Sequence, residues 1–183
     1  MTTTHTTGAE LQTQREALHL TREDLATLAG VQARTVKHWE SGRAGVPADV
    51  ADLLDRMETA VHQASASHAQ HVARMIRSAG RAPADVVLIR YRTTEDLERF
   101  QPEMKGFPAG AHAAMVQRLA ETMRTAHRIR PRIVWMDADA YAAWRQAAPD
   151  QRPDTSATRA QWAAEAALPS QAMPHRADQP PGA

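Results

Sequence analysis

The sequence predicts a mainly α-helical protein, in which an N-terminal helical domain is followed by a small α/β unit. Within residues 20–42, apolar side chains recur at the spacing of two short helices, with Gly30 between them. Glycine adopts a left-handed turn at little cost, so this position predicts a tight connection between the two helices. From Val86 onward the apolar residues alternate as in a strand, and residues 133–136 form a second short apolar run.

Length and composition exclude several classes of protein. The 183 residues suit one or two small domains, and the absence of cysteine excludes a disulfide framework or a thiolate metal site. No apolar run approaches the ~20 residues that span a membrane, and no signal-peptide segment is apparent. We therefore expect a cytoplasmic protein without membrane contact. The net charge of +1 gives no global signature of nucleic-acid binding, so that case rests on local sequence.

Four successive helices are predicted in the N-terminal part of the chain. The first covers about 8–18, and the second begins after Thr21, which can cap it together with Asp24. The third follows the glycine turn and ends at Gly42. Pro47 then occupies the first turn of a fourth helix, where its missing N–H costs nothing.

The third of these helices has one apolar side and one side suited to DNA. Val31, Val36 and Trp39 face inward. The outward residues include no acid, and each can hydrogen-bond a base edge or a phosphate: Gln32, Arg34, Thr35, Lys37 and His38. This is the layout of a helix-turn-helix that reads DNA. The alternative interpretation is an ordinary solvated face with basic residues there by chance.

We assign base reading to four residues of the outward side and phosphate contact to three basic residues. Arg34 can hold guanine O6 and N7 through two hydrogen bonds, worth ~1–3 kcal/mol of discrimination against other bases. The candidate base readers are Gln32, Arg34, Thr35 and His38, and the candidate phosphate contacts are Arg22, Lys37 and Arg43.

This stretch resembles the XRE-type (Cro/cI) helix-turn-helix of phage repressors, whose pattern is L-x-x-x-x-L-A-x-x-x-G-V-S-x-x-T-[IV]-x-x-W-E-x-G. The matching positions are Leu20, Leu25, Ala26, Gly30, Val31, Thr35, Val36, Trp39, Glu40 and Gly42. Gln32 departs from the pattern, because the family has Ser or Thr there to cap the recognition helix. The resemblance implies a five-helix, lambda-repressor-like domain that binds double-stranded DNA, with Trp39 in its core. It also implies that Glu40 organises the turn after the helix.

A second resemblance extends further along the chain. The motifs W-E-S-G-R and P-x-D-V, followed by a long helix and a small α/β part, look like the anti-CRISPR-associated repressors. In that group the C-terminal part forms a dimer, and the dimer represses its own operon at an inverted repeat. The resemblance therefore implies a homodimeric autorepressor of a phage or mobile element.

The α/β unit is predicted to consist of two strand–helix repeats. Helices are expected at 94–100, 109–126 and 138–147. The repeats are offset by 44 residues, so that Ile89 corresponds to Ile133, Tyr91 to Trp135 and Thr93 to Asp137. Thr93 or Thr94 is expected to cap the helix at 94–100, and Asp137 the helix at 138–147. A two-stranded sheet is marginally stable alone, so we expect this unit to dimerise.

We expect the chain to divide into a disordered start (1–7), a helix-turn-helix domain (8–62), a helical arm or linker (63–84), an α/β dimerisation unit (85–147) and a disordered tail with one short helix (148–183). The arm carries His68 and His71, and His62 precedes it. No carboxylate or cysteine accompanies these histidines at ligand spacing, so we predict no metal site.

Four arginines after the middle of the α/β unit form a candidate second nucleic-acid patch: Arg124, Arg128, Arg130 and Arg132. This patch could contact flanking DNA or RNA. The alternative is a basic helix C-terminus that complements the helix dipole.

No catalytic constellation, phosphate loop or dinucleotide fingerprint occurs, so we predict neither an enzyme nor a cofactor. The sequence predicts a transcriptional regulator, a homodimer that represses its own gene at an inverted-repeat operator. Two alternatives stay open. One is a repressor whose α/β unit senses a small molecule, and the other is an antitoxin or RNA-binding regulator that uses the second patch.

Overall fold

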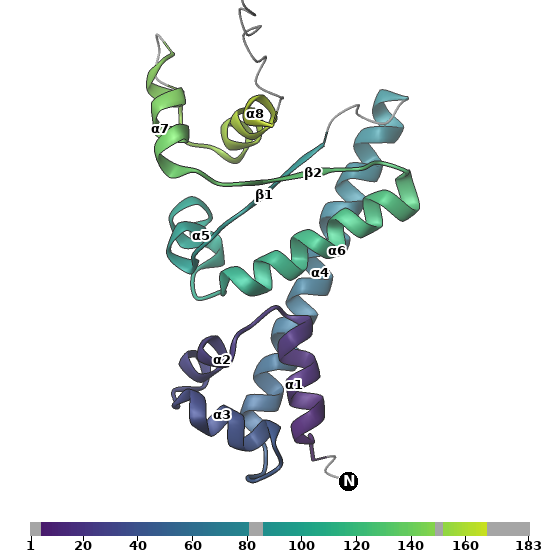
Figure 1. Cartoon of the computed structure of the whole chain (residues 1–183). Helices are drawn as coiled ribbons and strands as arrows, with labels where there is room; N and C mark the ends of the chain where they lie inside the picture. Colours follow the sequence, from purple (N-terminus) through teal and green to yellow (C-terminus); the bar gives the residue numbers. More distant parts are fainter. Residues whose placement is uncertain (1–4, 81–85, 149–151, 168–183) are drawn as a thin grey trace, which may run out of the picture.

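A computed structural model describes residues 5–80, 86–148 and 152–167 of the chain. These residues form eight α-helices, one short 3-10 helix and a two-stranded sheet. The long helix α4 (Ala48–Ala79) runs through the molecule, with α1, α2 and α3 around its first half and the sheet beside its second half (Figure 1). The prediction of a mainly α protein with a small α/β part is confirmed.

The four helices predicted in the N-terminal part are present. They are α1 (Gly8–Ala17), α2 (Arg22–Ala29), α3 (Ala33–Glu40) and α4. Thr7, which lies in the range expected to be disordered, caps α1 through its side chain. The segment expected as an arm or a linker is helical over 63–79, because α4 continues without a break until Gly80 takes a left-handed conformation, and its last residues, 81–84, lie outside the described residues.

The first core lies among these helices and includes a fifth helix from the C-terminal part of the chain. Leu11, Leu25, Val36 and Leu54 are completely buried in it. Helix α6 (Ala109–His127) adds Ala111, Ala114 and Met115 to the same core. The helix-turn-helix part and the α/β part are therefore packed together through α6.

A glycine allows α6 to approach the helix-turn-helix part closely. A Cβ atom on Gly110 would lie 2.4 Å from the backbone oxygen of His19, in the connection between α1 and α2. Only a residue without a side chain leaves room for the two backbones at this distance. No local pattern in the sequence indicates this contact.

The sheet consists of β1 (Val87–Arg90) and β2 (Arg132–Trp135), which pair in parallel with Val87 opposite Arg132. The strands pass between α6 on one side and α7 and α8 on the other (Figure 1). Side chains of β1 pack on both faces, with Leu88 beside α6 and Ile89 in a second core. Both faces of β1 are therefore half-buried, unlike the outer strand β2.

The predicted repeat holds for the helix caps but not for the strands. Thr93 and Asp137, which are 44 residues apart, cap α5 (Thr94–Phe100) and α7 (Ala138–Gln146). The strands instead pair at an offset of 45 residues. A shift of one residue changes the face of the sheet. The predicted correspondence between Tyr91 and Trp135 is therefore wrong, since Tyr91 is 2% exposed and Trp135 is 41% exposed.

The tail contains the expected short helix, which is part of the fold. This helix, α8 (Ser156–Ala166), buries Trp162 in the second core with Tyr91, Tyr141 and Phe100. Apart from this expected helix, the expectation of disorder is wrong for 152–155, where Asp154 accepts a hydrogen bond from Tyr141 and Thr155 caps α8. The same expectation for 1–4, 149–151 and 168–183 lies outside the described residues. In the described part of the chain, no helix has the length and hydrophobicity needed to cross a membrane.

Candidate nucleic-acid interface

Local signals fix the bounds of α2 and the turn after it. The Thr21 hydroxyl accepts a hydrogen bond from the Asp24 backbone N–H, and the Asp24 carboxylate accepts one from the Thr21 N–H at 2.8 Å. This reciprocal capping box starts α2. Gly30 ends it with φ of 65°, in the left-handed region that favours glycine. Helix α3 then leaves the turn in a new direction.

The inward side of α3 is anchored by apolar packing. Val36 is completely buried, and Trp39 is 6% exposed. Both side chains belong to the first core together with Leu25 and Ala26 of α2. The prediction that Trp39 is a core residue is confirmed. This packing determines which side of α3 faces outward.

The outward side of α3 presents most of the predicted DNA-contacting residues. Gln32, Arg34, Lys37 and His38 are exposed, and Thr35 is half-buried beside them. Gln32 is the N-cap residue of α3, but its side chain makes no capping hydrogen bond, as its departure from the family pattern predicts. The structure thus brings the four candidate base readers onto one surface.

Two of the three candidate phosphate contacts flank this surface without internal partners. Lys37 lies on α3 and Arg43 lies in the loop after it, and both are exposed. Neither residue forms a salt bridge with another residue in the described ranges, and the same is true of Arg34. These cations are available for an anionic partner such as the phosphate backbone.

The third candidate phosphate contact, Arg22, is engaged inside the protein. Its Nε atom donates a hydrogen bond to Glu40, and its side chain is 42% exposed. Glu40 also accepts from Arg15 Nε at 2.6 Å, and Arg15 Nη1 donates to the Leu20 carbonyl at 2.6 Å. The structural partner of Arg22 is therefore a carboxylate, which the sequence analysis did not anticipate.

Glu40 holds three helices together. Its side chain is 3% exposed and lies between Arg15 of α1 and Arg22 of α2. Burial acts to raise the pKa of the Glu40 carboxyl, but the hydrogen bonds and charges of the two arginines outweigh it, so the pKa lies below its ordinary value. Sequence comparison pointed to a role in the following turn. The structure corrects this interpretation, since the ionised carboxylate fixes α3 to α1 and α2.

The candidate second patch lies at the C-terminal end of α6 and along the following strand, well away from α3 (Figure 1). Its arginines are all exposed: Arg124, Arg128, Arg130 and Arg132. Arg128 is the C-cap of α6, in a left-handed conformation, and Arg124 lies in the last turn. This placement fits the interpretation as a basic helix end and also leaves the side chains accessible.

The histidines near the middle of α4 have local partners. His62 Nε2 lies 3.5 Å from Glu58 Oε1, and a ring nitrogen of His68 lies 2.8 Å from the Ala64 carbonyl oxygen. The part of the chain that the structure describes contains no group of three His, Cys, Asp or Glu side chains arranged to hold a metal ion.

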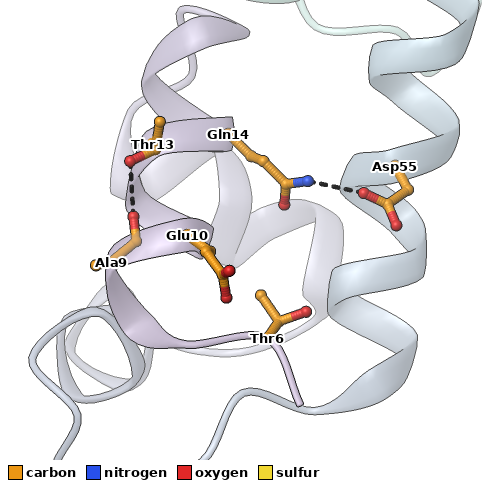
Figure 2. Close-up of a pocket in the computed structure, with 6 residues that line it drawn as sticks. All are labelled: Thr6, Ala9, Glu10, Thr13, Gln14 and Asp55. Carbon is orange, nitrogen blue, oxygen red and sulfur yellow. Dashed lines mark hydrogen bonds between the residues drawn. The ribbon is translucent and has the colours of Figure 1, made fainter. Parts of the chain in front are cut away.

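A separate depression of about 520 Å³ lies between α1 and α4 (Figure 2). Gln14 Nε2 donates to Asp55 Oδ1 across it at 2.8 Å, and the Thr13 hydroxyl donates to the Ala9 carbonyl. The Glu10 carboxylate on its wall accepts from the Thr7 backbone N–H at 2.7 Å, and this bond lowers the pKa of Glu10. These polar groups hold α1 and its cap in place, while Gln14 Oε1 is enclosed without a hydrogen-bond partner among the described residues.

Comparison with known proteins agrees with this geometry. A search of curated proteins found no match to the chain. A family model described as a helix-turn-helix domain matches residues 7–66, which include α1, α2, α3 and the first half of α4. Residues 7–66 thus form a helix-turn-helix domain, which indicates a DNA-binding regulator.

Proposed function

We propose that this protein is a sequence-specific transcriptional regulator that represses its own gene, in the manner of the XRE-type repressors of phages and mobile elements that it resembles. One observation carries the proposal. Helix α3 is fixed from behind by Val36 and Trp39, while Arg34 and His38, four residues apart, are exposed on its outward side. A helix held in this way can enter the major groove as a rigid unit.

The exposed residues on and beside α3 have two proposed roles, base reading and phosphate contact. Arg34 has the chemistry to bind guanine O6 and N7, while Gln32, Thr35 and His38 can reach neighbouring base edges. Lys37 and Arg43 supply sequence-independent attraction to phosphates. Arg22 contributes to phosphate binding only through the guanidinium nitrogens that Glu40 does not engage.

Binding as a homodimer is the second part of the proposal. A recognition helix of eight residues contacts few base pairs, so a second copy at a half-site about one helical turn (~34 Å) away would supply the missing affinity. The strand β2 offers a surface for that copy. Ile133 is 49% exposed and Trp135 is 41% exposed. In the described residues β2 pairs with β1 alone, which leaves its other edge open.

The experiment that tests the proposal is selection of genomic DNA fragments by the purified full chain, followed by sequencing. At salt near the cellular concentration, the enriched fragments should share an inverted repeat and include the region upstream of the protein's own gene. Equal retention of a scrambled duplex and of every genomic fragment would refute sequence-specific binding. Preferential binding of RNA, lost when Arg124 and Arg130 are reversed in charge, would instead support the RNA-binding or antitoxin alternative.

A further inference from the structure

A cleft of about 460 Å³ lies between α4, β1, α6, α8 and the 3-10 helix η1 (Pro102–Met104). Its walls are mostly aliphatic and include Ile89, Met115 and Leu119. The volume falls within the range of sites that bind small organic molecules. Neither the outward side of α3 nor the edge of β2 uses this cleft, so its function lies beyond DNA binding.

His112 is the unusual residue in this apolar wall. It lies on α6, lines the cleft and is only 2% exposed. The edge of its ring packs against Tyr91, with the ring centres 5.2 Å apart. Its Nδ1 atom is enclosed and has no hydrogen-bond partner among the described residues. A buried polar atom without a partner is destabilising, and an apolar side chain would pack there without this cost.

Arg90 of β1 lies outside the lining of the cleft, but its positive charge acts on His112. Its Nε atom is also enclosed without a partner in the described part of the chain, and its guanidinium lies 4.8 Å from the centre of the Trp135 ring. Burial, and then the charges of Arg90 and His68, lower the pKa of His112 to about 4. The imidazole is therefore neutral at neutral pH and lies in a region of positive potential.

The other charged groups around the cleft do not supply the missing acceptor. Glu103 of η1 lines the cleft but is exposed to solvent. Arg159 of α8 is paired with Asp154. A negatively charged group in the cleft would accept a hydrogen bond from an imidazole N–H of His112 and would be attracted by the positive charge of Arg90.

We propose that this cleft binds a small apolar carboxylic acid, whose carboxylate accepts a hydrogen bond from the His112 imidazole and whose hydrocarbon part packs against Ile89, Met115 and Leu119. The His112 Nδ1 atom is enclosed, so binding requires the side chains around it to move. The flexible methionine at position 115 is suited to such an adjustment.

The test uses the full chain and octanoate as the probe, with octanamide as the uncharged control of equal length, and it needs no DNA. Calorimetric titration should give saturable binding of one octanoate per chain. Octanamide should bind at least about tenfold more weakly, because hydrogen bonds to a charged group are the stronger ones. Octanoate should also move the NMR signals of the His112 ring. Absence of saturable binding, or equal affinity for the two probes, would overturn the proposal.

A variant pair tests the role of the imidazole. His112→Phe keeps an aromatic ring against Tyr91 and removes both nitrogens, so it should weaken octanoate binding at least about tenfold. His71→Phe makes the same substitution at an exposed position on α4 and should leave the affinity unchanged. Equal binding by His112→Phe and the wild type would refute the site. If His112→Phe fails to fold, the comparison of octanoate with octanamide and the NMR signals of the His112 ring, both measured on the wild-type protein, still test the proposal.

Discussion

The Arg15 guanidinium and the Glu40 carboxylate lie 2.6 Å apart, Nε to Oε1, between α1 and α3. Both side chains are almost fully buried, and Arg22 of α2 binds the second oxygen of the same carboxylate. One acid therefore connects three helices behind the surface proposed to read DNA. Its removal leaves the buried Arg15 charge with the exposed Glu16 carboxylate as its remaining ionic partner in the described residues.

The first prediction concerns this connection. Replacing Glu40 by glutamine should lower the free energy of unfolding by about 3 kcal/mol, because breaking a buried ion pair leaves an uncompensated charge. The matched control is Glu16→Gln, since Glu16 pairs with the same Arg15 at 3.3 Å but its side chain is 57% exposed. The control should lose less than about 1 kcal/mol. Urea unfolding measures both values, and equal losses would contradict the role given to Glu40.

The second prediction is a dependence of stability on acid pH. The pKa of Glu40 is lowered in the folded state, because the two arginines outweigh burial, so the unfolded chain binds a proton here at higher pH than the folded chain does. The stability that Glu40 contributes is complete above its unfolded pKa of about 4.3 and is lost as the pH falls through the lower folded pKa.

The difference in unfolding free energy between the wild type and Glu40→Gln measures this contribution. It should be constant near neutral pH and shrink below about pH 4.3. Glu10, whose pKa is lowered by its bonds to Thr7, is present in both proteins and cancels from the difference. A difference that stays constant through this acid range would show that the carboxylate is not stabilised in the folded state.

The third prediction concerns the turn that orients α3. A Cβ on Gly30 would meet no atom within 4 Å, so alanine is disfavoured there only by the backbone φ of 65°. We expect Gly30→Ala to cost about 1 kcal/mol of stability. Gly45 also has open space around a Cβ, without the left-handed φ, so Gly45→Ala should cost nothing. Thermal unfolding measures the stability of the two variants. A loss in Gly30→Ala alone indicates backbone strain at the left-handed φ, whereas equal losses would indicate that neither loop tolerates an added side chain.

Local sequence signals were sufficient to predict most of the secondary structure. Thr21, Thr93 and Asp137 cap the helices that follow them, and Gly30 makes the predicted turn. Each signal acts within a few residues, so it can be read from the sequence alone. The outward side of α3 was predictable for the same reason, because helical periodicity fixes which side chains share a face.

Contacts between distant residues could not be predicted in this way. Glu40 and Arg15 are 25 residues apart and lie on different helices, so no spacing pairs them. The approach of Gly110 to His19 depends on where α6 lies. The burial of His112 likewise results from the packing of α6 on the strand β1. Each of these features follows from tertiary structure, which overrides local preference.

The fourth prediction separates base reading from phosphate contact. Arg34→Ala should weaken binding to the selected operator by about 1–3 kcal/mol while leaving binding to random DNA less affected. Arg43→Ala should weaken binding to both duplexes by similar factors and reduce the salt dependence. Fluorescence anisotropy with operator and scrambled duplexes at several salt concentrations measures these effects. If both variants lost affinity equally on both duplexes, the assignment of Arg34 as a base reader would be wrong.

The fifth prediction tests the proposed homodimer and the assignment of its interface to β2. Ile133→Glu places a charge at an exposed position on the open strand, so it should leave each chain folded and convert the dimer to a monomer. Sedimentation velocity measures the mass in solution, and circular dichroism checks the fold.

Met75 provides the matched control, because it is another large apolar residue that is mostly exposed, 53% by area, but it lies on α4. Met75→Glu should therefore keep the dimer and its operator affinity. Ile133→Glu should weaken operator binding steeply, since two half-sites no longer act together. A dimer that survives Ile133→Glu but dissociates in Met75→Glu would move the interface from β2 to the long helix.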